Sequence, residues 1–245
     1  MLARGRLTVL DIEVADGVAT LWLARPDRGN ALGDELVTAL DAALDRVMAE
    51  GARLVVLRGR GRNFCTGLDL SDLESASEGD LALRIIRIEL LLQRIHALPV
   101  STMAIAGGRV FGAGADLFAV CDHRVALAGS SFAFPGPAFG LVLGTARLAG
   151  LVGDGVARRL LLSGATVEAD AALQLGLATA VVEDAAEVIA AARAAAIRLD
   201  APTVAALHGR TRRADDAGDL AALARSVARP GLRQRILDYR AAARR

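Results

Sequence analysis

The sequence predicts an α/β fold in which a largely parallel sheet is crossed by helices and followed by a helical C-terminal region. Three observations lead to this fold class. Between residues 54 and 128, short apolar runs typical of buried strands alternate with segments of helical spacing. Strands that alternate with helices pair in parallel, because each helical crossover carries the chain back to the same end of the sheet. From about Asp154 onward helical patterns dominate, interrupted only by a short apolar piece at Ala178 to Val182.

The first part of the chain predicts a hairpin, a helix and a strand. Asp11 to Leu23 alternates as two short strands that meet at Asp16-Gly17, a dipeptide suited to a turn with positive φ. Residues 36–48 carry apolar side chains at helical spacing with charged residues opposite, which predicts an amphipathic helix. Leu54 to Leu57 is apolar and bounded by Arg and Gly, so it predicts a strand that is buried on both faces.

The middle of the chain continues the alternation. Residues 81–97 predict a long helix that Pro99 stops. Val100 to Ala106 predicts the next strand, and it is followed by a glycine-rich loop. Gly114 to Cys121 then predicts a buried helix, and Arg124 to Ala128 predicts a further strand.

Composition excludes several classes of protein. The 29 basic and 28 acidic residues nearly cancel, so the chain has no general attraction for nucleic acid or for a membrane surface. Its apolar runs are broken well before the roughly 20 residues that a membrane span needs. The segment Met1 to Arg6 leads into alternating polar residues rather than an apolar signal region, so a cytoplasmic location is expected. Cys65 and Cys121 lack the number and spacing of a disulfide framework or a metal site, and we expect reduced thiols and no structural metal.

Two glycine-containing loops are the candidate site for binding a reacting carbonyl group. Phe64 to Leu70 and Gly107 to Asp116 each follow an apolar run, so each resembles an exit from a strand. Two such loops can aim two backbone N–H groups at one point, which is what stabilising the oxyanion of a thioester enolate requires. Each such donor is worth about 3 kcal/mol of barrier.

The residues around the expected donors are small enough for a substrate to approach. Gly67 precedes Leu68, while Gly112 and Gly114 flank Ala113. The second loop also opens a helix, whose N-terminal partial positive charge adds to the stabilisation of an anion.

Four segments in this order resemble the crotonase, or enoyl-CoA hydratase/isomerase, family. They are Arg25-Pro-Asp-Arg-Gly-Asn-Ala-Leu32, Phe64-Cys-Thr-Gly-Leu-Asp-Leu70, Gly112-Ala-Gly-Ala-Asp-Leu-Phe-Ala-Val-Cys-Asp122, and the stretch from Leu161 to Leu177. The resemblance implies a spiral of ββα units with a C-terminal helical region. It divides the chain into an acyl-CoA-binding core, residues 1–195, and a helical region, residues 196–245, that serves assembly and covers the pocket. It also implies an acyl-CoA substrate with no separate cofactor, and a homotrimer or a hexamer formed as a dimer of trimers.

The resemblance assigns roles to individual residues. Leu68 and Ala113 would supply the oxyanion N–H groups, and Arg28 would lie near the CoA phosphates. Asp69 and Leu70 would line the nucleotide side. The expected substrate-binding set is completed by Cys65, Gly67, Gly112 and Gly136.

The two catalytic acids of the family's hydratases are carried over separately. The first falls on Asp116, one methylene shorter than the Glu usual in hydratases. The second follows a Phe-x-x-Pro motif and falls on Gly136, which has no proton-transfer group. The chain is also about three residues shorter than family members between Gly140 and Arg147, which predicts a reshaped pocket wall. A loop acid that some isomerases use there has no counterpart.

One carboxylic acid, Asp116, together with the two expected amide donors favours moving a double bond over adding water. Hydration needs a base for the water and an acid for the α-carbon, whereas a single carboxylate can shuttle a proton between two carbons. Loss of one general acid or base costs about 10²- to 10⁴-fold, so weak hydration stays compatible with the sequence.

Three alternatives remain open at this point. Asp116 could cap the helix that follows the glycines instead of moving protons. The chain could be a non-catalytic acyl-CoA-binding protein, which Gly136 and the shortened loop favour and which Asp116 and the two loops oppose. The glycine loop could also bind a dinucleotide, although it lacks a clean G-x-G-x-x-G.

Overall fold

The computed structural model describes residues 3–7 and 9–242, so the two ends of the chain, residues 1–2 and 243–245, lie outside the description. In chain order the elements are β1 (Ala3–Leu7), β2 (Leu10–Ala15), β3 (Val18–Leu23), η1 (Pro26–Arg28), α1 (Asp34–Ala49), β4 (Leu54–Gly59), α2 (Glu78–His96), β5 (Ser101–Ala106), β6 (Arg109–Phe111), α3 (Ala113–Ala119), β7 (His123–Leu127), β8 (Ser131–Ala133), η2 (Gly136–Phe139), α4 (Thr145–Val152), α5 (Asp154–Ser163), β9 (Val167–Glu168), α6 (Ala169–Gln174), β10 (Ala180–Val182), α7 (Ala186–Arg198), α8 (Ala201–Thr211), α9 (Asp216–Val227) and α10 (Leu232–Ala242).

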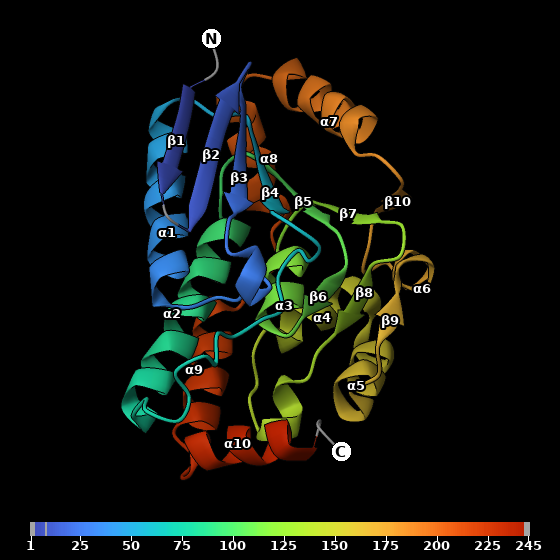
Figure 1. The fold of residues 1–245 in the computed structure, drawn as a ribbon. Helices are drawn as coiled ribbons and strands as arrows, with labels where there is room; N and C mark the ends of the chain where they lie inside the picture. The colour runs from blue at the N-terminus through green and yellow to red at the C-terminus, as the bar shows by residue number, and fades with distance from the viewer. Residues whose placement is uncertain (1–2, 8, 243–245) are drawn as a thin grey trace.

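Within the described residues, one sheet contains seven strands in the order β1-β2-β3-β4-β5-β7-β10 (Figure 1). The first three strands pair antiparallel, and every later neighbour pairs parallel. The predicted hairpin is confirmed, because β2 and β3 pair through a turn in which Asp16 and Gly17 have φ of 52° and 77°. The predicted parallel sheet is confirmed from β3 to β10.

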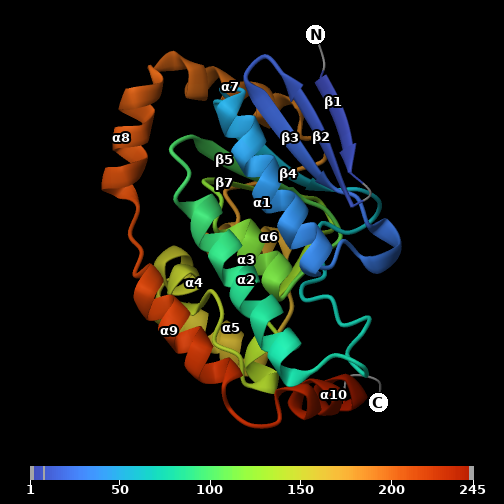
Figure 2. The same ribbon diagram turned by 90° about the vertical axis from the view of Figure 1, so that its left-hand side faces the viewer.

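Helices cover both faces of this sheet. Buried leucines of α1 and of α2 pack with the sheet in one core cluster, and the two helices lie side by side in Figure 2. On the other face, Leu54 and Val56 of β4 pack in a cluster with Ala192 and Ala196 of α7. Val55 and Leu57 belong to the first cluster, so β4 is buried on both faces, as its apolar run predicted.

A second, smaller sheet was not predicted. It contains β6, β8 and β9, in that order. The expected loop after Gly107 therefore contains a strand, and the expectation that Ala178 to Val182 alone interrupts the C-terminal helices is wrong, because Val167–Glu168 is also a strand. Strands of two or three residues are too short to show an alternating pattern, and only pairing with distant segments defines them.

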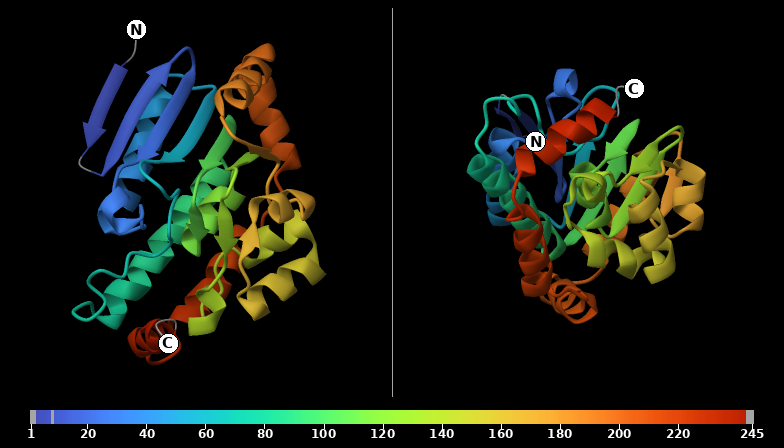
Figure 3. Two further views of the ribbon diagram at one scale, coloured as in Figure 1. Left: turned by 45° about the vertical axis from the view of Figure 1, so that its right-hand side comes forward. Right: turned by 90° about the horizontal axis from the view of Figure 1, so that it is seen from below.

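Of the C-terminal helices, α9 and α10 lie at the lower end of the molecule, whereas α7 and α8 lie at its upper end (Figure 2). α9 lies along α2, and α10 crosses the lower end beside η2 (Figure 3). Arg235 of α10 holds this arrangement, since its guanidinium donates to the carbonyl oxygens of Phe139 at 2.8 Å, Arg229 at 3.0 Å and Ser226 at 3.2 Å. No helix in the described part of the chain is long and apolar enough to cross a membrane.

Candidate active site

The first loop is fixed by backbone hydrogen bonds to the segment before α1. The Leu32 amide donates to the Gly67 carbonyl at 2.7 Å, and the Asp69 amide donates to the Leu32 carbonyl at 3.0 Å. These two bonds form a parallel bridge between Leu32 and Leu68. The N–H of Leu68 is not used in this bridge and stays available to a ligand.

The second loop is fixed against the first in the same way. The Phe111 amide donates to the Cys65 carbonyl at 3.0 Å, and the Gly112 amide donates to the Ala133 carbonyl of β8 at 2.8 Å. Ala113 is the first residue of α3, so its N–H has no acceptor within the helix. Among the hydrogen bonds of the described residues, neither the Leu68 nor the Ala113 amide is a donor.

Gly67 brings the two loops together. Its φ is +98°, and a Cβ atom at this position would lie 2.7 Å from the Phe111 carbonyl oxygen and 3.4 Å from the Ala113 nitrogen. A side chain cannot be placed there without moving backbone atoms. The close approach therefore requires glycine, and it sets Leu68 and Ala113 beside each other.

A cavity of about 180 Å³ opens next to these two residues. Its wall is mostly apolar and comes from both halves of the chain. The lining residues are Thr66, Gly67, Leu68, Leu70, Ile85, Ile88, Phe111, Gly112, Ala113, Asp116, Phe134, Pro135, Gly136, Pro137, Phe139, Leu141, Leu143, Leu161 and Tyr239. Asp116 is the one carboxylic acid among them.

Asp116 is buried in the α3 helix and is 5% exposed. Burial raises its pKa to about 8; the positive charge of Arg147 opposes this shift and the negative charge of Glu89 adds to it. The carboxyl group therefore holds a proton at neutral pH and gives it up just above, which suits a proton shuttle. Asp116 makes no side-chain cap of α3, which begins at Ala113, although it lies in the first turn of that helix.

Gly144 lies directly against this carboxyl group. Its φ is +63°, and a Cβ atom there would lie 2.0 Å from Oδ1 of Asp116. The segment between Gly140 and Arg147 thus forms the wall that touches the acid. Sequence reasoning predicted a reshaped wall but did not identify this contact.

Gly136 opens η2 and lines the same cavity as Asp116. A Cβ atom at this position would meet only the Cβ of Leu141, at 3.7 Å, which is ordinary contact. The site therefore has room for a side chain where the family resemblance expects the second acid, and the chain places none there.

The other predicted residues are distributed more widely. Leu70 and Gly112 line the cavity, whereas Cys65 is fully buried behind it. Burial raises the pKa of the Cys65 thiol to about 12, so the thiol stays protonated and is a poor nucleophile. Arg28 of η1 has 57% of its side chain exposed, with Asp27 4.0 Å away.

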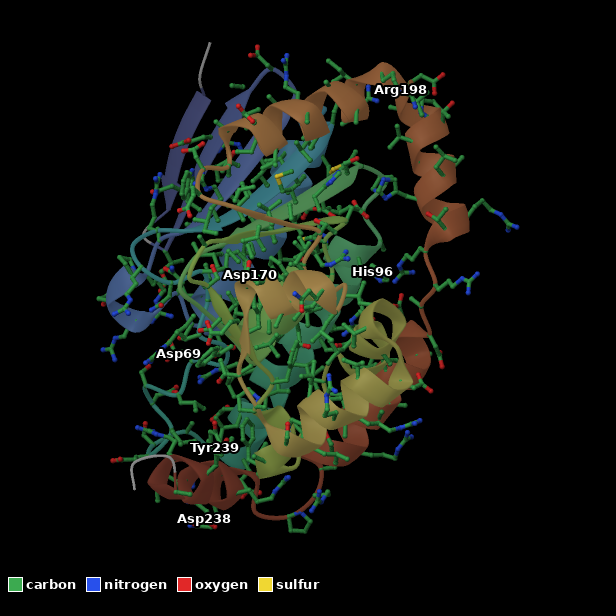
Figure 4. The ribbon with its side chains drawn as sticks, turned by 90° about the vertical axis from the view of Figure 1, so that its right-hand side faces the viewer. Asp69, His96, Asp170, Arg198, Asp238 and Tyr239 are labelled. Atoms are coloured by element: carbon green, nitrogen blue, oxygen red, sulfur yellow. The ribbon has the colours of Figure 1, made fainter. Side chains whose placement is uncertain are left out.

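Asp69 has a structural partner instead of a place in the cavity. Its carboxylate accepts from Arg25 at 2.7 Å and from the Ser71 amide at 2.9 Å. Burial alone would raise its pKa, but these hydrogen bonds from Ser71 and Arg25 hold the value below the ordinary range. Figure 4 shows Asp69 above α10, which carries the cavity residue Tyr239.

Sequence reasoning missed the far wall and the charges behind Asp116. The wall residues Leu141, Leu143 and Tyr239 carry no motif, and only the tertiary fold brings them together. Glu89 and Arg147 form a buried ion pair between α2 and α4, and no local sequence pattern predicts this pair. The described residues contain no cluster of His, Cys, Asp and Glu that could hold a metal ion.

Comparisons with known proteins agree with this geometry. A family model described as enoyl-CoA hydratase/isomerase matches residues 13–220. The crystal structure of a "putative enoyl-CoA hydratase/isomerase" from Bordetella parapertussis is 46% identical, with a TM-score of 0.92 over 94% of this chain and 98% of the other. A "Probable enoyl-CoA hydratase" of Mycobacterium leprae is 36% identical over 178 residues, 69% of this chain and 70% of the relative. A "Probable enoyl-CoA hydratase" of Bacillus subtilis is 30% identical over 197 residues, 78% of this chain and 76% of the relative.

The fold expected from the four motifs is therefore confirmed, including its C-terminal helices. The comparisons cover the two loops, α3 and the shortened segment, all of which lie within the matched residues. The chain belongs to the enoyl-CoA hydratase/isomerase family, the crotonase superfamily, whose members act on acyl-CoA thioesters.

Proposed function

We propose that the protein moves the double bond of an unsaturated acyl-CoA thioester and hydrates such thioesters poorly. The observation that supports this is the single carboxylic acid of the cavity: Asp116 lines it, and so does Gly136, at the position where the family resemblance would put a second acid. The thioester carbonyl would accept from the Leu68 and Ala113 amides. Arg28, which is exposed on η1, would contact the CoA phosphates.

The proposed reaction needs one group that both takes and returns a proton. Ionised Asp116 removes a proton from the carbon next to the carbonyl of a 3-enoyl thioester, and the electron pair of that C–H bond moves into a dienolate. The two amides stabilise the charge on oxygen. Protonated Asp116 then delivers the same proton to the far carbon, which leaves a 2-enoyl thioester and restores the carboxylate.

Hydration requires more than this site provides. A water molecule must lose a proton to a base while the α-carbon receives one from an acid. The cavity wall offers Asp116 for one of these tasks, and apolar side chains and backbone surround the rest of the ligand.

Two rates measured on one preparation test the proposal. We expect turnover of a 3-enoyl-CoA to exceed hydration of the matched 2-enoyl-CoA, and Asp116→Asn to abolish it while acyl-CoA binding persists in calorimetry. Fast hydration without isomerisation would refute the proposal. Binding without any turnover across chain lengths would instead favour the non-catalytic acyl-CoA-binding protein.

Assembly belongs to the same proposal. We infer a homotrimer or a dimer of trimers, with residues 196–245 serving both assembly and pocket cover, since Tyr239 of α10 already closes part of the cavity. Light scattering coupled to gel filtration gives the mass, and a monomeric mass at micromolar concentration would contradict this inference.

A further inference from the structure

A buried ion pair joins α2 and α4, the two helices that pack against the helix of Asp116. Arg147 of α4 donates from Nη1 to Oε1 of Glu89 at 3.0 Å and from Nη2 to Oε2 at 2.5 Å. Glu89 of α2 is 1% exposed, and Arg147 is 8% exposed. Neither residue lines the cavity, so neither is positioned to touch a substrate.

Both partners are held in place by further contacts. Gln93, one turn along α2, donates to Oε1 of Glu89 at 2.7 Å. Arg147 also donates to Asp219 of α9 at 3.2 Å. The Nε–H of Arg147 is buried and has no acceptor in the described part of the structure. A buried bidentate pair of this kind is rigid, and removing one partner leaves the other charge uncompensated.

The pair supplies the charges that reach Asp116. The helix α3 packs against α2, α4, β5 and β6. Of these elements, α2 contributes the negative charge of Glu89, and α4 contributes the positive charge of Arg147. The strand β5 has no ionisable side chain, and Arg109 of β6 is exposed. Asp219 acts on the same guanidinium from α9.

Resting on the proposed function, we propose that Glu89 is a positioning residue for proton transfer: it holds the Arg147 guanidinium and cancels its charge, so that Asp116 can carry the proton that it must return to the substrate. The positive charge of Arg147 acts on the buried Asp116 carboxyl group and alone would stabilise its carboxylate form. Glu89 prevents this without contacting the ligand. The burial of Asp116 by the cavity wall then decides its protonation, and the raised pKa agrees with that balance.

The test is a titration of the Asp116 carboxyl group in the full-length protein without substrate. Carbon-13-labelled aspartate is followed by NMR, and the Asp116 signal is assigned by its loss in Asp116→Asn. We expect Glu89→Gln to weaken proton binding at Asp116 at least tenfold, a fall of one pH unit or more in the midpoint. The matched control is Glu78→Gln at the exposed start of α2, which should leave the midpoint unchanged.

A second variant separates charge from disruption of the fold. Glu89→Gln combined with Arg147→Gln removes both charges and keeps side chains that can hydrogen-bond, so the midpoint should return to within about half a pH unit of the wild type. This double variant also serves if the single variant fails to fold. A folded Glu89→Gln variant with an unmoved midpoint, or a double variant shifted by more than one unit, would overturn the proposal.

This readout is independent of the reaction. Proton binding at Asp116 is measured on the free protein, so the titration still decides the role of Glu89 if no enoyl-CoA is turned over. If turnover is present, the pH at which the ionised base appears should fall by the same amount in Glu89→Gln, because the kinetic and spectroscopic midpoints then belong to one group.

Discussion

A carboxylic acid introduced at position 136 should increase the rate at which the protein hydrates a 2-enoyl-CoA. The change is Gly136→Glu, at a position that lines the cavity with Asp116. The backbone of Gly136 does not have a positive φ, and a Cβ atom would meet only Leu141, at 3.7 Å. The substitution therefore adds a carboxyl group without forcing the backbone to move.

The expected gain follows from the role of the added group. A positioned general acid or base contributes about 10²- to 10⁴-fold, or about 3 to 5 kcal/mol of barrier. We expect the lower end, because the new carboxyl group enters a pocket that was not built to orient it. Hydration is followed by the loss of absorbance of the conjugated enoyl thioester.

The control is Gly136→Gln, which has nearly the same shape but no titratable group. If the Glu variant folds and binds acyl-CoA yet hydrates no faster than the Gln variant, Gly136 is not the position that limits hydration. The reasoning from a single carboxylate would then fail.

Three further predictions concern Asp116 and its surroundings. The pKa of Asp116 rises from an ordinary 3.8 to about 8 on folding, so its contribution to stability is fully present below pH 4 and falls by on the order of 5 kcal/mol as the pH rises from 4 through 8. Asp116→Asn should lack this loss in urea unfolding, and parallel curves of stability against pH would contradict the burial argument. Gly144→Ala should displace the Asp116 carboxyl group and cut turnover at least tenfold in a folded protein. The control Gly150→Ala lies within α4 with open space around it, and it should leave turnover unchanged. Equal turnover by the two variants would show that the contact between Gly144 and Asp116 is unimportant. Phe118→Ala should lower the free energy of unfolding by about 3 to 5 kcal/mol, because the Phe118 ring packs against two other phenylalanine rings in the core. A loss below about 1 kcal/mol in thermal or urea unfolding would mean that the core closes over the space that the ring leaves.

The long elements could be predicted because their patterns are local. The helix over residues 36–48 shows its apolar face within a single window, and the observed helix extends it only to Asp34–Ala49. The strand at Leu54 was recognisable because both of its faces are apolar. The two loops were visible because glycine is required where backbones approach each other, as at Gly67.

The remaining features depend on residues that meet only after folding. The strands of the small sheet are too short to have a period, and Val167 pairs with Phe132 from 35 residues earlier in the chain. The contact of Gly144 with Asp116 depends on how the segment between Gly140 and Arg147 folds back onto α3. Glu89 and Arg147 are 58 residues apart, and no local rule links them.

The Leu68 and Ala113 amides are positioned by main-chain bonds that their neighbours make to Leu32, Cys65 and Ala133, not by their own side chains. Alanine substitutions across these loops should therefore change turnover little, because truncating a side chain leaves the backbone N–H groups in place. Under the proposed function, the two loops would keep their role through side-chain exchanges that spare the glycines, whereas a single substitution would remove the one carboxylic acid of the cavity. If the proposed function holds, the reaction that follows enolate formation could thus be changed by substituting one or two side chains, with the loops that stabilise the enolate left as they are.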